Sequence, residues 1–102
     1  MSVIEVIFWM VACHMIGDYV LQNDFIATTK GSNWYHLIVH SVLYCVPFAF
    51  LFKYMGYGIV YICALLITHI IIDASKARYK SIDYLGDQIL HYLMIFIIIM
   101  YQ

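Results

Sequence analysis

Four apolar segments take up most of this 102-residue chain, and each is about long enough to cross a lipid bilayer. Hydrophobic residues make up 66% of the sequence and charged residues only 11%, whereas about a quarter of the residues in a typical soluble domain are charged. A membrane-spanning helix needs about 20 consecutive, mainly apolar residues. The sequence therefore predicts a single all-α membrane domain over residues 1–102, with helices at about 3–22, 34–52, 57–75 and 85–101.

Each of these segments carries two polar side chains that lie four positions apart. The pairs are His14/Asp18, His36/His40, His69/Asp73 and Asp87/His91. On an α-helix, positions i and i+4 share one face, so each helix can direct two side chains to one place. Ionisable side chains are costly inside a bilayer and by default indicate a functional site. The alternative is a network of hydrogen bonds that only holds the helices together.

The four pairs are predicted to lie at one depth in the membrane. Those of the first and third helices are near the helix ends, and those of the second and fourth are near the helix starts. Because successive helices run in opposite directions, all the pairs fall in the same half of the bilayer. At about 1.5 Å per residue, most lie within roughly 12 Å of the membrane boundary. We therefore expect a compact four-helix bundle with one polar cluster.

The distribution of basic residues predicts the orientation of the bundle. Lys30 lies in the first loop, and Lys76, Arg78 and Lys80 lie in or beside the third, whereas the second loop has only Lys53. Cytoplasmic loops carry an excess of lysine and arginine. We therefore expect the first and third loops in the cytoplasm, both termini outside, and the cluster near the cytoplasmic leaflet of a bacterial inner membrane.

The residue types in the pairs are those that bind metal ions. Imidazole suits zinc, iron, copper and nickel, and carboxylates suit harder ions such as manganese. We expect one or two divalent ions, with zinc as the first choice and iron or manganese as alternatives. The predicted ligands are His14, Asp18, His36, His40, His69, Asp73, Asp87 and His91.

Three of these ligands and four further polar residues are predicted to have additional roles. The candidate catalytic residues are Asp18, Asp73, Asp87 and Lys76. Those expected to hold the ligands in place are Gln22, Gln88 and Lys30. Lys76 follows Asp73 by three positions, so the two can form an ion pair on one helix face, or Lys76 can hold a lipid phosphate near the membrane surface.

Taken together, these motifs resemble a known family. The stretch His14-Met-Ile-Gly-Asp-Tyr-Val-Leu-Gln22 is followed by Lys30, His36-xxx-His40, His69-xxx-Asp73-xx-Lys76 and Asp87-Gln-xx-His91. The arrangement is similar, over nearly the whole chain, to small bacterial and phage membrane proteins filed as domain of unknown function 3307. The resemblance implies a small polytopic membrane protein, sometimes phage-encoded, and supplies no activity. A looser similarity to membrane-bound metal-dependent hydrolases favours hydrolysis by analogy alone.

Several functions stay open from the residues. The first is a metal-dependent hydrolase acting on a lipid or lipid-linked substrate, because a bound divalent ion can supply hydroxide. The second is a transporter or channel for metal ions or protons. The third is a non-enzymatic phage or bacterial membrane effector with a structural metal site, and a redox di-iron enzyme is a weaker fourth. The expected partners are the bilayer, a lipid substrate and further copies of the chain; no basic aromatic surface suggests nucleic acid.

Overall fold

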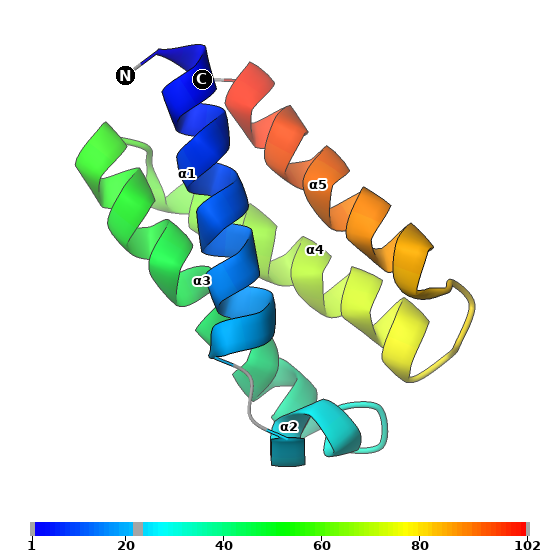
Figure 1. Cartoon of the computed structure of the whole chain (residues 1–102). Coiled ribbons are helices and arrows are strands. Elements are labelled where there is room, and N and C mark those ends of the chain that lie inside the picture. Colours follow the sequence, from blue (N-terminus) through cyan, green and yellow to red (C-terminus); the bar gives the residue numbers. More distant parts are fainter. Residues whose placement is uncertain (1, 22–23, 102) are drawn as a thin grey trace.

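The computed structural model describes residues 2–21 and 24–101, and this part of the chain folds into helices joined by short connections (Figure 1). In chain order the elements are α1 (Val3–Met15), the π-helical turn η1 (Ile16–Val20), α2 (Asp24–Thr29), α3 (Trp34–Met55), α4 (Ile59–Ala77) and α5 (Tyr84–Met100). The all-α class predicted from the sequence is confirmed.

Capping residues set the ends of the long helices. The Asn33 side chain accepts hydrogen bonds from the first turn of α3, and the Asp83 side chain accepts one from Gly86 N at 2.7 Å at the start of α5, as is typical of N-caps. Gly56 ends α3 in the left-handed conformation, with φ 78°, which glycine adopts without steric cost. As a result, α3 runs three residues past its predicted end at 52, and α4 begins at 59 instead of 57.

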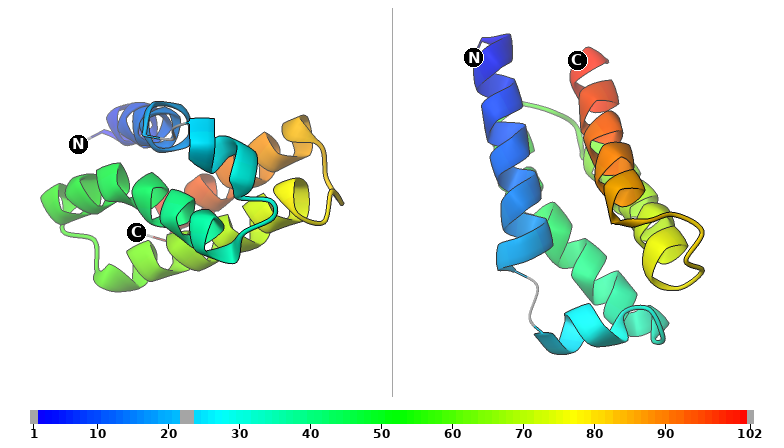
Figure 2. Two further views of the ribbon diagram at one scale, coloured as in Figure 1. Left: turned by 90° about the horizontal axis from the view of Figure 1, so that it is seen from below. Right: turned by 45° about the vertical axis from the view of Figure 1, so that its right-hand side comes forward.

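The four long helices form an antiparallel bundle. Helix α1 packs against α3 and α5, and α4 packs against the same two helices. Both α2 and the α4–α5 connection lie at one end of the bundle, whereas the α3–α4 turn, the start of α1 and the end of α5 lie at the other (Figures 1 and 2). The first connection, predicted as a polar loop, contains α2. The molecule extends over 39 × 22 × 22 Å, so its long axis exceeds a bilayer core of about 30 Å.

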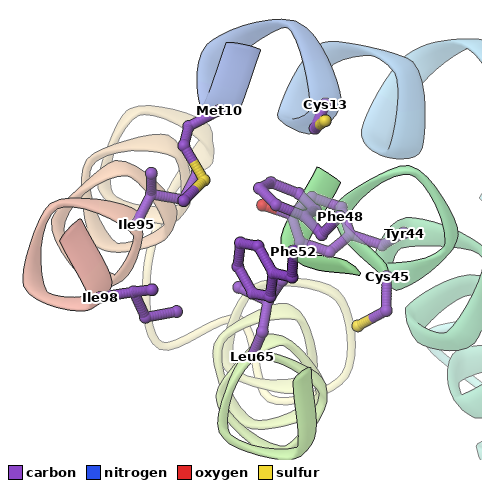
Figure 3. Close-up of a cluster of buried hydrophobic side chains, with 9 residues drawn as sticks. All are labelled: Met10, Cys13, Tyr44, Cys45, Phe48, Phe52, Leu65, Ile95 and Ile98. Carbon is purple, nitrogen blue, oxygen red and sulfur yellow. The ribbon is translucent and has the colours of Figure 1, made fainter. Parts of the chain in front are cut away.

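Apolar side chains from all four long helices fill the bundle toward the α3–α4 turn (Figure 3). Met10, Phe48 and Phe52 are at most 1% exposed, and Leu65 and Ile95 pack against them. Close van der Waals packing of this kind drives helix association where lipid replaces water. The polar cluster occupies the other half of the bundle, nearer to α2.

Large apolar side chains also cover the outside of the bundle. Ile4, Phe50 and Ile59 are each at least 74% exposed. An apolar surface of this extent marks a protein that contacts a membrane or a partner. Three segments of the described chain, Val3–Val20, α3 and α4, are long and apolar enough to span a membrane, whereas α5 is an apolar helix of 17 residues.

Candidate metal centre

Six buried side chains from the bundle helices bring their donor atoms together in two adjoining groups. Asp18, His40 and His69 form one group, and Asp73, Asp87 and His91 form the other; within each group the donor atoms lie within 4.8 Å of one another. The groups meet where His40 Nε2 lies 3.6 Å from Asp73 Oδ2. Each member is at most 8% exposed. The predicted convergence of polar side chains from all four long segments is therefore present.

In the first group, one oxygen of Asp18 faces two imidazoles. Asp18 Oδ1 lies 3.4 Å from His40 Nε2 and 3.8 Å from His69 Nε2. The other oxygen, Oδ2, accepts a hydrogen bond from Gln88 Nε2 at 3.1 Å. His69 is held in the same manner, because its Nδ1 shares a hydrogen bond of 3.0 Å with Ser41 Oγ. Supporting contacts of this type fix the orientation of metal ligands.

In the second group, Asp87 repeats the same arrangement. Its Oδ1 lies 3.2 Å from His91 Nε2, and its Oδ2 accepts a hydrogen bond from Gln88 Nε2 at 3.2 Å. Asp73 contacts a cation instead, since Lys30 Nζ lies 3.1 Å from its Oδ2. The amide of Gln88 therefore touches a carboxylate of each group and joins the two.

Six buried side-chain atoms of the cluster make no hydrogen bond within the part of the chain that the structure describes. They are Nδ1 and Nε2 of His40, Nε2 of His69, Nε2 of His91, Oδ2 of Asp73 and Oδ1 of Asp87. Asp73 Oδ2 still has its ion-pair contact with Lys30. A buried polar atom without a hydrogen bond costs about 1–3 kcal/mol. Since a neutral imidazole has a lone pair on only one ring nitrogen, His40 offers one of its two nitrogens to a cation; together with the other four atoms it makes a site that a bound cation would satisfy.

His14, a predicted ligand, lies behind the cluster. Its Nε2 donates to Gln88 Oε1 at 2.9 Å, so the neutral ring accepts at Nδ1 from the Tyr44 hydroxyl at 2.7 Å. Both ring nitrogens are therefore engaged. The Tyr44 ring also stacks on His69, with ring centroids 4.0 Å apart, and His69 stacks on His91 at 4.6 Å. His14 and Tyr44 thus pack behind the cluster without facing its two groups of donor atoms.

His36, also a predicted ligand, is not brought to the cluster. It is half-buried in the first turn of α3, where its Nδ1 shares a hydrogen bond of 2.6 Å with Thr29 Oγ1 and its ring packs on Phe25. It joins α2 to α3. The spacing of four that relates it to His40 places it one turn nearer to the end of the bundle.

The lysine contacts differ from the sequence prediction. Asp73 pairs with Lys30 from the connection after α2, whereas Lys76 lies 4.0 Å from Asp87 Oδ2 and over the Tyr84 ring. Gln88 and Lys30, both predicted as supporting residues, contact carboxylates of the cluster: Gln88 contacts Asp18 and Asp87, and Lys30 contacts Asp73. Gln22, the third predicted supporting residue, lies outside the described residues.

Two glycines allow the backbone to approach closely enough to build this arrangement. A Cβ on Gly17 would lie 2.7 Å from the carbonyl oxygen of Tyr44, so only glycine lets η1 pack this close to α3. A Cβ on Gly31 would lie 2.5 Å from the carbonyl oxygen of Ala77, which keeps the connection that carries Lys30 against the end of α4. The π-helical turn at η1 agrees with the frequent occurrence of such turns at functional sites.

A family model described as protein of unknown function (DUF3307) matches residues 6–102. The chain belongs to this family. Neither a curated protein nor a solved structure matches it. The resemblance stated from the motifs is therefore confirmed, and for this DUF3307 protein the function has to be argued from the cluster itself.

Proposed function

We propose that this chain is a four-span protein of the bacterial inner membrane, with α2 and the α4–α5 connection in the cytoplasm and both ends outside. Helix α5, with 17 residues, meets the lower limit of about 17 for a span, and its outward residues Leu85, Phe96 and Met100 are each more than half exposed. Four of the five basic residues lie in or beside the connections at the proposed cytoplasmic end. This bias supports the orientation.

The buried cluster binds a divalent metal ion in this proposal, and zinc is the first choice. The observation that carries the proposal is the set of six buried nitrogen and oxygen atoms that form no hydrogen bond with any residue the structure describes. Asp18, His40 and His69 offer two imidazoles and one carboxylate. That combination serves in catalytic zinc sites and in non-haem iron sites, where it leaves positions for water or substrate.

The charges of the cluster favour one divalent ion over two. With neutral imidazoles, the three carboxylates Asp18, Asp73 and Asp87 face two ammonium groups, those of Lys30 and Lys76. The sum of these charges is −1. A single divalent ion together with one anionic ligand, such as hydroxide or a substrate group, brings the sum to zero. A second divalent ion would leave the site strongly positive, which is costly away from water. The ion pairs therefore support a metal held by the first group, with the second group beside it.

The chemistry that we propose is hydrolysis of a lipid or lipid-linked substrate. A divalent ion lowers the pKa of a water ligand toward neutrality and polarises a phosphoryl or carbonyl oxygen. Asp87 lies next to the first group and is a candidate base, because its Oδ1 makes no hydrogen bond among the described residues. Lys76, whose side chain is 30% exposed, is placed to hold negative charge on a substrate. The depth of the cluster near one end of the spans suits a lipid headgroup.

The apolar half of the bundle weighs against a transport path within one copy of the chain. Met10, Phe48, Phe52 and Leu65 fill the space between the helices on the far side of the cluster. An ion that left the cluster toward the outer leaflet would have to cross this packed region. A site that binds and reacts from one side therefore fits better.

The experiment that tests this proposal is metal analysis of the protein purified in mild detergent. Elemental mass spectrometry should find about one zinc, iron or manganese ion per chain, and the His69→Ala/His91→Ala double variant should lose it. His36→Ala is the matched control, because His36 lies outside the cluster, and it should keep the metal. If the wild-type protein holds no metal and does not take it up when it is supplied, the proposal fails. Bound metal whose removal unfolds the bundle, with no hydrolysis of any lipid, would instead indicate a structural ion.

A further inference from the structure

An apolar groove of about 200 Å³ runs between α4 and α5 on the outside of the bundle. It is lined chiefly by Ile71 and Ile72 of α4 and by Leu90, Leu93, Met94 and Ile97 of α5. A methylene group is about as large as a water molecule, which takes up about 30 Å³, so the groove accepts roughly seven such groups. This is part of one acyl chain and too little for two.

The groove leads to a cation beside the candidate metal centre. Thr68, Ile72 and Lys76 follow one another at intervals of four on α4 and so form one row. On α5, Leu90 is one turn from Asp87. Both rows therefore end at the Lys76–Asp87 contact, where the ammonium group lies 4.0 Å from the carboxylate.

Lys76 differs from the neighbouring cations in being open to another anion. Its contact with Asp87 is long, its side chain is 30% exposed, and its ammonium group also lies 5.0 Å from the centroid of the Tyr84 ring, a contact that leaves its three N–H donors free to bind an anion. Lys30, by contrast, is buried against Asp73 at 3.1 Å. The Arg78 guanidinium lies over the Trp34 ring and donates to the Gly31 carbonyl. Lys76 is therefore placed to take an anionic group at the head of the groove.

Two other apolar grooves on the bundle lack such a head group. The groove between α1 and α5, of about 110 Å³, is lined by Val11 and Tyr92 among others. Four positions before Tyr92 on the same face of α5 is Gln88, which is neutral. The groove between α3 and α4, of about 220 Å³, is lined by Ala49 and Leu66 among others. One turn on toward the polar cluster it meets apolar residues, and one turn on from Ala49 in the other direction is Lys53, at the end of the bundle away from the cluster. Among these three grooves, only the α4–α5 groove leads to a partly exposed cation that contacts a carboxylate of the candidate metal centre.

We propose that the α4–α5 groove binds one acyl chain of a phosphate-headed lipid and that Lys76 binds its phosphate. This inference rests on the proposed function, because it names the substrate class of the same site. Negative charge on the headgroup complements the ammonium group, and the apolar lining complements the chain. The phosphate is thereby held beside Asp87 and the first ligand group.

Photocrosslinking tests the proposal with metal-free protein, kept in chelator in phosphatidylcholine nanodiscs. The probe is phosphatidic acid with a diazirine on one acyl chain, and the crosslinked residues are mapped by mass spectrometry. We expect crosslinks to concentrate at residues 71–72 and 90–97. Lys76→Gln should weaken labelling about fivefold, the factor that one lysine near anionic lipid is worth, and Lys76→Arg should restore it. Diacylglycerol with the same photoreactive chain has no phosphate, so it should label the wild-type protein and the Lys76→Gln variant equally.

Matched bulky substitutions give the second readout. Leu93→Trp fills the α4–α5 groove and should abolish the concentrated labelling, whereas Val46→Trp fills the α3–α4 groove and should leave it unchanged; both side chains are exposed on the outside of the bundle. The inference is wrong if all three grooves are labelled equally, or if phosphatidic acid labels the Lys76→Gln variant as strongly as the wild-type protein. Because metal is removed throughout, the labelling tests the lipid site independently of the proposed metal-dependent hydrolysis. If the protein is labelled as expected but never binds metal, the hydrolase proposal is wrong and the lipid-binding proposal is supported.

Discussion

Replacing Gly17 with alanine should push η1 away from α3 and disturb the candidate metal centre at its first ligand. The added Cβ would lie 2.7 Å from the carbonyl oxygen of Tyr44 and 2.8 Å from its Cα. Favourable contacts between carbon atoms begin at about 3.5 Å, so the shortfall at Tyr44 Cα is roughly 0.7 Å. Both obstructing atoms belong to the backbone of a long helix. They can yield only if the two helices separate.

The expected cost follows from this geometry. Forcing an extra methyl group into a packed contact typically costs about 1–3 kcal/mol. The next residue, Asp18, places its Oδ1 at 3.4 Å from His40 Nε2 and 3.8 Å from His69 Nε2. A displacement of the same size as the shortfall changes these distances appreciably. We therefore expect metal affinity to fall about 10–100-fold, as it does when a residue that supports a ligand is lost.

Two measurements on detergent-solubilised protein check this prediction. Denaturant unfolding of the metal-free protein gives the change in free energy of unfolding, and competition with a chromophoric chelator gives the metal affinity. Gly58→Ala is the matched control, because nothing lies within 4 Å of its added Cβ and its φ of −71° suits alanine. Because Gly58 is the N-cap of α4, where glycine is preferred over alanine, the entropic gain of alanine is offset, and that variant should change the free energy of unfolding by less than about 1 kcal/mol and leave metal affinity unchanged. If the two alanine variants behave alike in both assays, the close approach at Gly17 does not position the ligand.

Three further outcomes follow from single contacts. Lys30→Met leaves a buried carboxylate without its cation and should lower the free energy of unfolding by about 3–5 kcal/mol, measured in the same denaturant assay. Tyr44→Phe removes the hydroxyl that His14 Nδ1 accepts from and should cost about 1–3 kcal/mol, while elemental analysis still finds the metal. In a cysteine-free background, Ser81→Cys should react with an impermeant maleimide only from the cytoplasmic face, and Lys53→Cys only from the other. Labelling of both from one face would contradict the four-span topology.

The sequence predicted the architecture of the bundle and the half of it that holds the polar residues. Apolar segments interrupted by turns determine where the helices lie, and alternating chain direction brings the polar pairs to one end. What the spacing could not show is a departure from regular α-helix. Between His14 and Asp18 the helix passes into the π-helical turn η1, so the two side chains separate: Asp18 faces the imidazoles, and His14 turns to Tyr44 and Gln88.

Two residues outside the four pairs, Tyr44 and Ser41, and the partner of Lys30 escaped the prediction for a different reason. Tyr44 follows His40 by four positions and would have been found by extending that helix face by one turn, but a tyrosine in an apolar segment gives no chemical signal. Ser41, which holds His69, is equally inconspicuous. The ion pair of Lys30 with Asp73 depends on α2 and on the close approach at Gly31. These are tertiary features that no local pattern contains.

The two halves of the bundle are held together by different forces, and this affects how variants of the cluster should be interpreted. In lipid, apolar side chains stabilise a bundle through packing, and that packing is concentrated toward the α3–α4 turn. The opposite end depends on polar links instead: Tyr19 hydrogen-bonds to Tyr84, Lys30 pairs with Asp73, and Gln88 joins both ligand groups. Removing one of the clustered side chains therefore weakens the helix contacts as well as the proposed metal site. Loss of metal is informative only beside a variant such as Tyr44→Phe, which weakens the same end of the bundle and leaves every donor atom in place.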